Sequence, residues 1–171
     1  MSLINFTDPL YIPTEDDRIN QIRANASQGK FPDLTEANLA ARYGYLRLLQ
    51  WLSTFTPAIY PDTTGIALAS INGHWQVLRW LVQRGITPTQ DWANYAIQNG
   101  QLDTMIWAIQ QGIYPDINSV DEAARQGYLE IIQFLSRLPT KILPSNRGFE
   151  LARQHGECTV VDWLDKQGVG R

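Results

Sequence analysis

Cysteine and histidine are scarce in this 171-residue chain, which holds one cysteine, Cys158, and two histidines, His74 and His155. A single cysteine excludes an intrachain disulfide and a zinc site built from cysteines. Fourteen Lys and Arg residues against 17 Asp and Glu residues leave no excess of positive charge to favour a nucleic-acid binder. No apolar run approaches the roughly 20 residues of a membrane span. Residues 1–13 lack the basic and apolar regions of a secretory signal.

These absences predict a cytoplasmic protein with no cofactor, no metal ion and neither nucleic acid nor membrane among its partners. The remaining composition is that of one folded domain, since 44% of the residues are apolar and 18% are charged. A chain of this length buries enough surface for an independent core.

A short repeat dominates the sequence. Glycine recurs five times at intervals of 29, 27, 27 and 29 residues, with an alanine four residues before each glycine and a proline twelve residues before it. Three residue types in fixed register at five places indicate a structural repeat. The glycines are Gly44, Gly73, Gly100, Gly127 and Gly156; the alanines are Ala40, Ala69, Ala96, Ala123 and Ala152; the prolines are Pro32, Pro61, Pro88, Pro115 and Pro144.

Each unit predicts two helices joined by a turn. The first helix follows the proline, runs for about nine residues and ends at the glycine, and the second carries apolar residues two, five, seven and eight positions after that glycine. A further glycine at 85, 112 and 168 suits a left-handed C-cap. The expected N-caps of the first helices are Thr35, Thr64, Asp91, Asn118 and, in the fifth unit, Asn146 or Ser145.

The chain is predicted to form a single domain over residues 14–171, preceded by an extended or partly disordered segment at 1–13. Thr14 and Asp17 are spaced as a capping box, which predicts a helix within 14–30 that caps the open end of the stack. The units are expected at about 31–59, 60–86, 87–113, 114–142 and 143–171.

Residues 69–81, which read ASINGHWQVLRWL, resemble the ankyrin repeat, and the resemblance extends over about residues 17–168. The period of 27–29 residues is shorter than the family's, which is about 33, and the family's Thr-Pro-Leu-His start is absent. The resemblance implies an all-α, ankyrin-like helical-repeat solenoid of five helix-turn-helix units plus an N-terminal capping helix, with truncated β-hairpin loops. It also implies protein–protein recognition through the concave, first-helix face.

The sequence offers little material for catalysis. His155 and Cys158 are three residues apart and could pair as imidazole and thiol, but Cys158 occupies a slot that holds leucine in three other units, which favours a small core residue. His74 matches the family's histidine, which serves the turn by hydrogen bonding. No phosphate loop, acid–base dyad or metal spacing is present, so a non-enzyme is expected.

The residues on either side of each repeated glycine vary between units, whereas the core slots do not. Such variation is expected of a partner-binding face and also of plain solvated positions; the presence of Arg and Tyr favours the former. Trp92, in a slot that is small or polar in the other units, is expected to be exposed, either for function or to shield a helix start. The candidate partner-binding residues are Arg42, Tyr43, Tyr45, Asn72, His74, Trp92, Gln98, Asn99, Arg125, Gln126, Tyr128, Gln154 and His155.

The predicted function is non-catalytic binding of another protein by a monomer. One alternative is a structural spacer or self-associating module, including one within a bacterial or viral host-directed protein that would act in the cytosol of a host cell. A remote alternative is an enzyme with a site at His155 and Cys158.

Overall fold

The computed structural model describes residues 12–170, and within them the chain forms eleven helices and no strand. The described part of the chain is therefore all-helical, as the sequence predicts. The helices are α1 (Glu15–Ala26), α2 (Leu34–Tyr43), α3 (Leu46–Leu52), α4 (Thr63–Ile71), α5 (Trp75–Gln83), α6 (Gln90–Gln98), α7 (Leu102–Gln110), α8 (Ile117–Arg125), α9 (Leu129–Ser136), α10 (Asn146–Gln154) and α11 (Cys158–Lys166).

In the first four units the first helix begins two residues earlier than predicted. The residue directly after the proline is the N-cap: Asp33 accepts a hydrogen bond from the N–H of Thr35 at 2.8 Å, and Asp62 accepts one from Thr64 at 2.8 Å. A carboxylate at this place reaches the free amides of the first turn, which corrects the assignment of Thr35 and Thr64 as caps. The same correction applies to Asp91 and Asn118, whose helices begin after Thr89 and Asp116; Ser145 caps the fifth unit.

The recurring alanine and glycine have one geometric cause. Each repeated glycine has a positive φ, and the next residue donates its backbone N–H to the carbonyl of the repeated alanine, as from Tyr45 to Ala40 at 2.8 Å and from His74 to Ala69 at 2.9 Å. This bond closes the first helix and sends the chain back antiparallel. All five alanines are fully buried, because a methyl group lets neighbouring helices approach closely.

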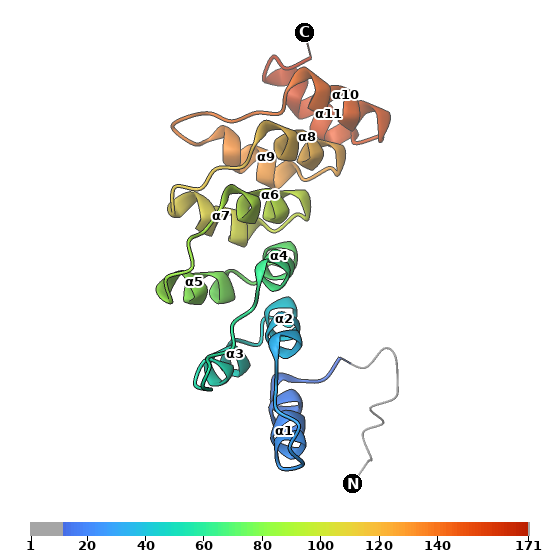
Figure 1. Cartoon of the computed structure of the whole chain (residues 1–171). Helices are drawn as coiled ribbons and strands as arrows, with labels where there is room; N and C mark the ends of the chain where they lie inside the picture. The colour runs from blue at the N-terminus through green and yellow to red at the C-terminus, as the bar shows by residue number, and fades with distance from the viewer. Residues whose placement is uncertain (1–11, 171) are drawn as a thin grey trace.

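The five helical pairs follow one another along an elongated stack (Figure 1). The first helices α2, α4, α6, α8 and α10 form one layer in which each contacts the next, and each second helix packs against the first helix of its own unit. At the N-terminal end, α1 contacts α3, and its Glu15 accepts the backbone N–H of Leu48 at 2.9 Å. Both bonds of the predicted capping box between Thr14 and Asp17 are present. The segment expected to be extended at 1–13 falls outside the described residues except for 12 and 13.

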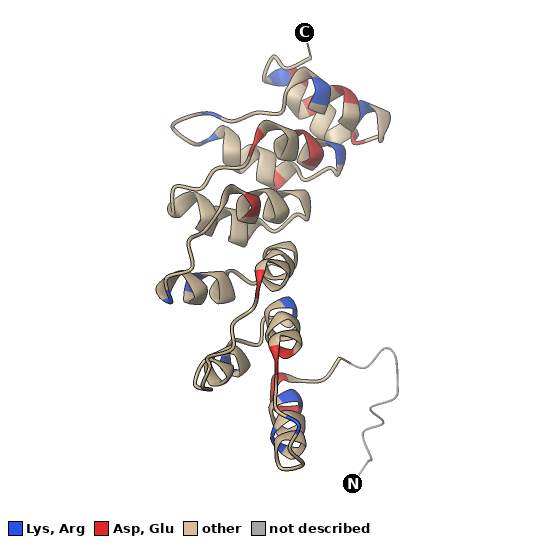
Figure 2. Ribbon diagram, in the orientation of Figure 1, with Lys and Arg blue, Asp and Glu red and all other residues tan. Residues whose placement is uncertain are grey.

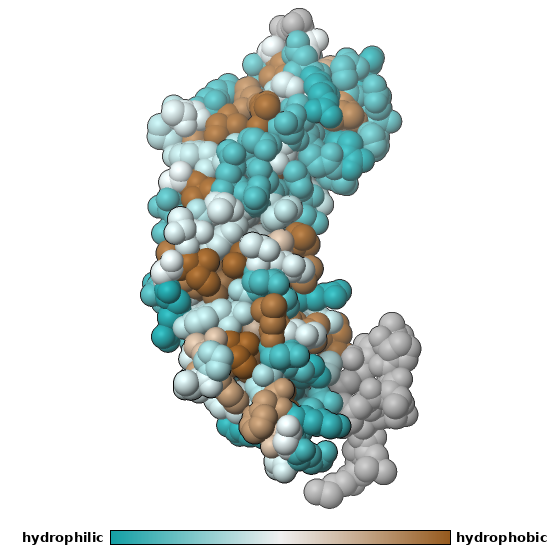
Figure 3. All heavy atoms as spheres, viewed as in Figure 1, coloured by the Kyte–Doolittle hydropathy of each residue, from teal (hydrophilic) through white to brown (hydrophobic). Residues whose placement is uncertain are grey.

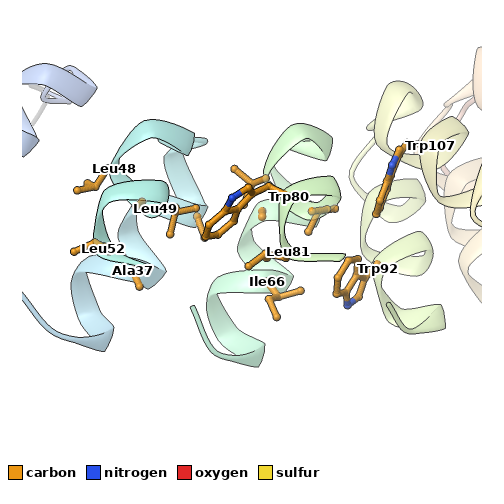
Figure 4. Close-up of a cluster of buried hydrophobic side chains, with 14 of the residues drawn as sticks. Ala37, Leu48, Leu49, Leu52, Ile66, Trp80, Leu81, Trp92 and Trp107 are labelled. Atoms are coloured by element: carbon orange, nitrogen blue, oxygen red, sulfur yellow. The ribbon is translucent and has the colours of Figure 1, made fainter. Parts of the chain in front are cut away.

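The apolar core runs along the stack between the two helix layers. Leucines of the second helices, such as Leu49, Leu52 and Leu81, are fully buried between units, and Trp80 lies among them (Figure 4). Apolar side chains reach the surface mainly at mid-length, while hydrophilic residues cover most of the C-terminal end on the face in Figure 3. No helix within residues 12–170 is both long and apolar enough to span a membrane.

A polar side chain near the start of the first helix bridges consecutive units at three junctions. Asn38 accepts the backbone N–H of Asp62 at 3.0 Å, Asn94 accepts that of Asp116 at 2.9 Å, and Asp121 accepts that of Ser145 at 2.7 Å. We call each of these bonds a rung. At the remaining junction, between α4 and α6, the equivalent position holds an alanine, at 67.

Candidate functional site

One side chain covers the glycine of the preceding unit at four successive junctions. A Cβ on Gly44 would lie 2.6 Å from Nδ1 of His74, and a Cβ on Gly100 would lie 3.0 Å from Cζ of Tyr128. These side chains are partly buried because they pack onto the neighbouring unit. The four pairs are Gly44 with His74, Gly73 with Gln101, Gly100 with Tyr128, and Gly127 with Glu157.

The predicted site residues His74 and Tyr128 therefore serve packing between units. Nε2 of His74 bonds to the carbonyl of Arg42 in the preceding unit at 2.9 Å rather than to its own turn. Burial lowers the pKa of His74, so the neutral imidazole is favoured. Tyr45 occupies the same slot in the first unit, and its hydroxyl donates to the carbonyl of Pro13. These three side chains join units.

A small aromatic group lies at the N-terminal end of the first-helix layer. The rings of Tyr43 and Tyr45 stack with their centroids 5.6 Å apart, and the Arg42 guanidinium lies 5.5 Å from the centre of the Tyr43 ring. The two tyrosines line a depression of about 180 Å³ together with Pro13 and Arg18. Arg42 is exposed, so it is the member of this group that is most open to a partner.

A larger polar cleft of about 470 Å³ crosses α6, α8 and α10 in the C-terminal half. Its lining includes the predicted residues Gln98 and Asn99. Four more lining residues escaped prediction, although two of them, Glu122 and Leu151, lie one helical turn before the predicted Gln126 and His155. The full lining is Gln98, Asn99, Asn118, Glu122, Arg147 and Leu151.

Hydrogen bonds across the units hold the side chains of this cleft. Gln98 donates to Oγ of Ser119 at 2.9 Å, which joins α6 to α8. Arg147 donates to Oδ1 of Asn118 at 3.1 Å, which joins the start of α10 to α8. Bonds between side chains reduce the rotamer freedom that a partner must restrict, so the cleft presents amide and guanidinium groups that are already ordered.

A charged network borders the cleft at the C-terminal end of α8. Arg125 donates to both carboxylate oxygens of Glu122, and Gln126 donates to Oε1 of that carboxylate at 2.9 Å. The hydrogen bonds from Arg125 are the main cause that lowers the pKa of Glu122. Nη1 of Arg125 lies 3.2 Å from Nε2 of His155, which links the network to the end of α10.

The exposed members of the predicted set occur in each of the five successive units. They are Arg42, Asn72, Asn99, Gln126 and, in the last unit, Gln154 and His155. Charged residues are less evenly spread: they are frequent on α1 and α2 and again from α8 onward, and α4 carries none (Figure 2). The polar cleft spans the last three units.

Trp92 was predicted to be exposed, and that prediction is wrong. Its side chain is only 4% exposed and stacks on Trp107 with 6.1 Å between ring centroids (Figure 4). Trp92 lies at the junction where Ala67 leaves space that a longer side chain takes at the rungs. A large residue in this slot therefore compensates for a small one in the unit before it.

Cys158 was predicted to lie in the core, but it is exposed. The equivalent residues of the inner units, such as Leu46 and Leu129, are partly buried, whereas no further unit follows α11 within the described residues. Both ring nitrogens of His155 bond elsewhere, Nδ1 with the carbonyl of Leu151 at 3.0 Å and Nε2 with Arg125. Nor do three His, Cys, Asp or Glu side chains come together as a metal site within residues 12–170.

Comparison with known proteins gives no family assignment, because no protein-family model matches this chain and no curated protein matches it in sequence.

Proposed function

We propose that the chain is a non-catalytic protein-binding module built as an ankyrin-type solenoid, and that its polar cleft is the main contact surface. The supporting observation is that three successive first helices each contribute to a single cleft of about 470 Å³. An extended partner segment lying across the helices would contact all three units at once.

The chemistry of the cleft favours a polar segment. Asn99 and Asn118 carry amides that both donate and accept, as a peptide main chain does, and Arg147 adds a cation suited to a carboxylate or carbonyl. The bonds from Gln98 and Arg147 order these groups before binding, which lowers the entropy cost of association. Binding then acts by occupancy, without a chemical step.

Affinity capture with paired variants tests this proposal. The full chain is used as bait in a cell lysate, alongside Arg147→Glu and a control, Arg137→Glu, which changes another exposed arginine that lies outside the cleft. We expect a captured protein that the wild type and Arg137→Glu retain and Arg147→Glu loses by tenfold or more, roughly the effect of 1.4 kcal/mol. Equal retention by both variants would contradict a role for the cleft.

A second matched pair tests the amide groups. Asn99→Ala alters the cleft, whereas Asn72→Ala alters the equivalent residue of the preceding unit, outside the cleft; both side chains donate to the carbonyl four residues earlier, at 2.8 and 2.7 Å. Greater loss of capture with Asn99→Ala is expected.

The spacer or self-association alternative is tested by sedimentation of the purified chain. A dimer would favour self-association over a monomeric binding module.

A further inference from the structure

The helix α5 begins with a tryptophan, Trp75, in a slot where packing between units needs no aromatic side chain. The equivalent residue is leucine in three other units, at 46, 102 and 129. Trp75 is only partly buried. Its indole N–H has no acceptor within residues 12–170, and its nitrogen is not one of the buried polar atoms without a partner, so it reaches solvent. Neither the size of this ring nor its donor is explained by packing.

Two adjoining grooves in the second-helix layer share Trp75 as a wall. One, of about 250 Å³, lies between α3 and α5, and its walls include Leu46 and Trp80. The other, of about 330 Å³, lies between α5 and α7, and its walls include Ile106 and Trp107. Figure 1 shows α3, α5 and α7 following one another along this side of the stack. Trp75 therefore stands between two partly apolar grooves that lie one helix apart.

Hydrogen-bond donors surround these grooves. The indole N–H groups of Trp80 and Trp107 also lack an acceptor among the described residues and reach solvent. Figure 4 shows both ring nitrogens at edges that face away from Ile66 of the first-helix layer. An indole N–H donates and cannot accept, so these groups suit a ligand with free carbonyl oxygens. Exposed amides add further donors, at Gln50, Gln76, Gln83 and Gln110.

A polyproline II segment matches both the spacing and the chemistry of the grooves. Its backbone makes no internal hydrogen bonds, so its carbonyl oxygens are free to accept, and proline has no N–H of its own. Three residues complete one turn, with a rise of about 9 Å. Neighbouring helices pack about 8–10 Å apart. Prolines three residues apart would therefore enter the two grooves on either side of Trp75.

Charges at the grooves select the residues that flank the prolines. Arg79 lines the groove between α3 and α5, and Asp103 lines the groove between α5 and α7. Both side chains belong to exposed residues, and neither forms an ion pair within residues 12–170. A segment that crosses both grooves complements them with an acidic residue beside Arg79 and a basic residue beside Asp103.

We propose that the second-helix face formed by α3, α5 and α7 binds a proline-rich segment of a partner protein in the polyproline II conformation. Trp75 lies between two prolines of that segment, and Arg79 and Asp103 pair with its flanking charges. This face belongs to the second-helix layer, whereas the polar cleft is lined by residues of α6, α8 and α10. The inference therefore goes beyond the proposed function and does not depend on the cleft.

Titration with a short peptide tests the proposal directly. The peptide acetyl-Glu-Pro-Pro-Ala-Pro-Arg-amide is added to the ¹⁵N-labelled full chain, and the indole resonance of Trp75 is followed by NMR. A saturable shift with a Kd below about 1 mM is expected. A peptide with alanine in place of all three prolines is not preorganised and should bind at least about tenfold more weakly. No saturation by roughly 5 mM of the proline peptide, or equal binding of the alanine peptide, would overturn the proposal.

A matched pair of tryptophan variants locates the binding site. Trp75→Leu places there the residue of three other units, so the chain should stay folded by circular dichroism while binding weakens at least about tenfold, as followed at the Trp107 indole. The control is Trp51→Phe, which places there the residue found at Phe134. Trp51 packs beside Arg23 and lines neither groove, so this variant should bind within about twofold of the wild type. Undiminished binding by Trp75→Leu would place the peptide elsewhere and refute the proposal.

Reversal of an exposed charge gives a test that does not rely on Trp75→Leu. The wild type should bind the peptide with Glu and Arg ends about two- to fivefold more tightly than acetyl-Arg-Pro-Pro-Ala-Pro-Arg-amide. Arg79→Glu should reverse this order, because both grooves then carry an acid. The same order in both proteins would contradict the assigned pairing. These titrations need no partner protein and probe a different face, so their failure is distinguishable from failure of the capture experiment.

Discussion

His74 and Gly44 are in van der Waals proximity across two units: a Cβ on Gly44 would lie 2.6 Å from Nδ1 of His74. The same glycine has a φ of 74°. Glycine is therefore required twice, once because the left-handed backbone disfavours a side chain and once because the neighbouring unit leaves no space. Gly85 has a φ of 88°, but a Cβ added to it would have no neighbouring atom within 4 Å, so it isolates the first requirement.

Gly44→Ala should destabilise the chain more than Gly85→Ala does. The backbone penalty of about 1–2 kcal/mol is common to both, whereas only Gly44→Ala also forces the His74 ring to move, at a further cost of about 1–3 kcal/mol. Urea unfolding followed by circular dichroism measures the difference. Equal losses of unfolding free energy in the two variants would show that the contact between Gly44 and His74 does not contribute to stability.

Stability should fall on acidification in a way that depends on His74. Burial lowers the folded-state pKa of His74, so the unfolded chain binds the proton more readily. The contribution is fully present above the unfolded pKa of about 6.5 and is lost as the pH falls through the lower folded value. Between about pH 7.5 and 5.5, the melting temperature should decline more steeply for the wild type than for His74→Gln. Glutamine is the residue that occupies the equivalent slot of the next unit, at Gln101. Parallel curves would contradict this.

The rung at Asn94 should contribute measurably to stability. Its amide accepts the N–H of Asp116 and donates to the Asp116 carboxylate, both at 2.9 Å, and the side chain is 9% exposed. Asn94→Ala should cost about 1–3 kcal/mol, because the partly buried backbone N–H of Asp116 loses its acceptor. The control is Asn72→Ala, which removes an exposed amide bonded within its own helix and should cost less than about 0.5 kcal/mol. Thermal unfolding of both variants measures the two losses, and a loss for Asn94→Ala no larger than that for Asn72→Ala would contradict the prediction.

The sequence predicts those features that recur in every unit. The alanine and glycine slots are uniform, since each unit closes its first helix with the same bond from the residue after the glycine to the alanine carbonyl. The N-caps are harder to place, because both the first and the third residue after the proline are of types that cap helices well. What decides is reach: Asp33 accepts from Thr35 at 2.8 Å, whereas Thr35 lies within the helix.

Features that depend on one pair of residues in different units are less open to prediction. The residues that follow the repeated glycines, such as His74 and Tyr128, look exposed in a single helical unit, and only stacking places Tyr128 over Gly100. Trp92 looks anomalous until it is paired with Ala67 of the preceding unit. The signal is present in the sequence as a relation between slots, since the two asparagines at 38 and 94 are matched by Gly65 and Ser119.

A double-mutant cycle on Ala67 and Trp92 tests this relation. Trp92→Ser alone leaves a cavity beside Trp107 and should cost about 3–5 kcal/mol, and Ala67→Asn alone crowds the indole and should cost about 1–3 kcal/mol. Together they recreate the arrangement of Asn94 and Ser119, in which the asparagine accepts the N–H of the next N-cap residue. The double variant should therefore lose less than the sum of the single losses, by about 1–3 kcal/mol. Denaturant unfolding of the four proteins gives the coupling, and strict additivity would mean that the two side chains do not compensate for each other.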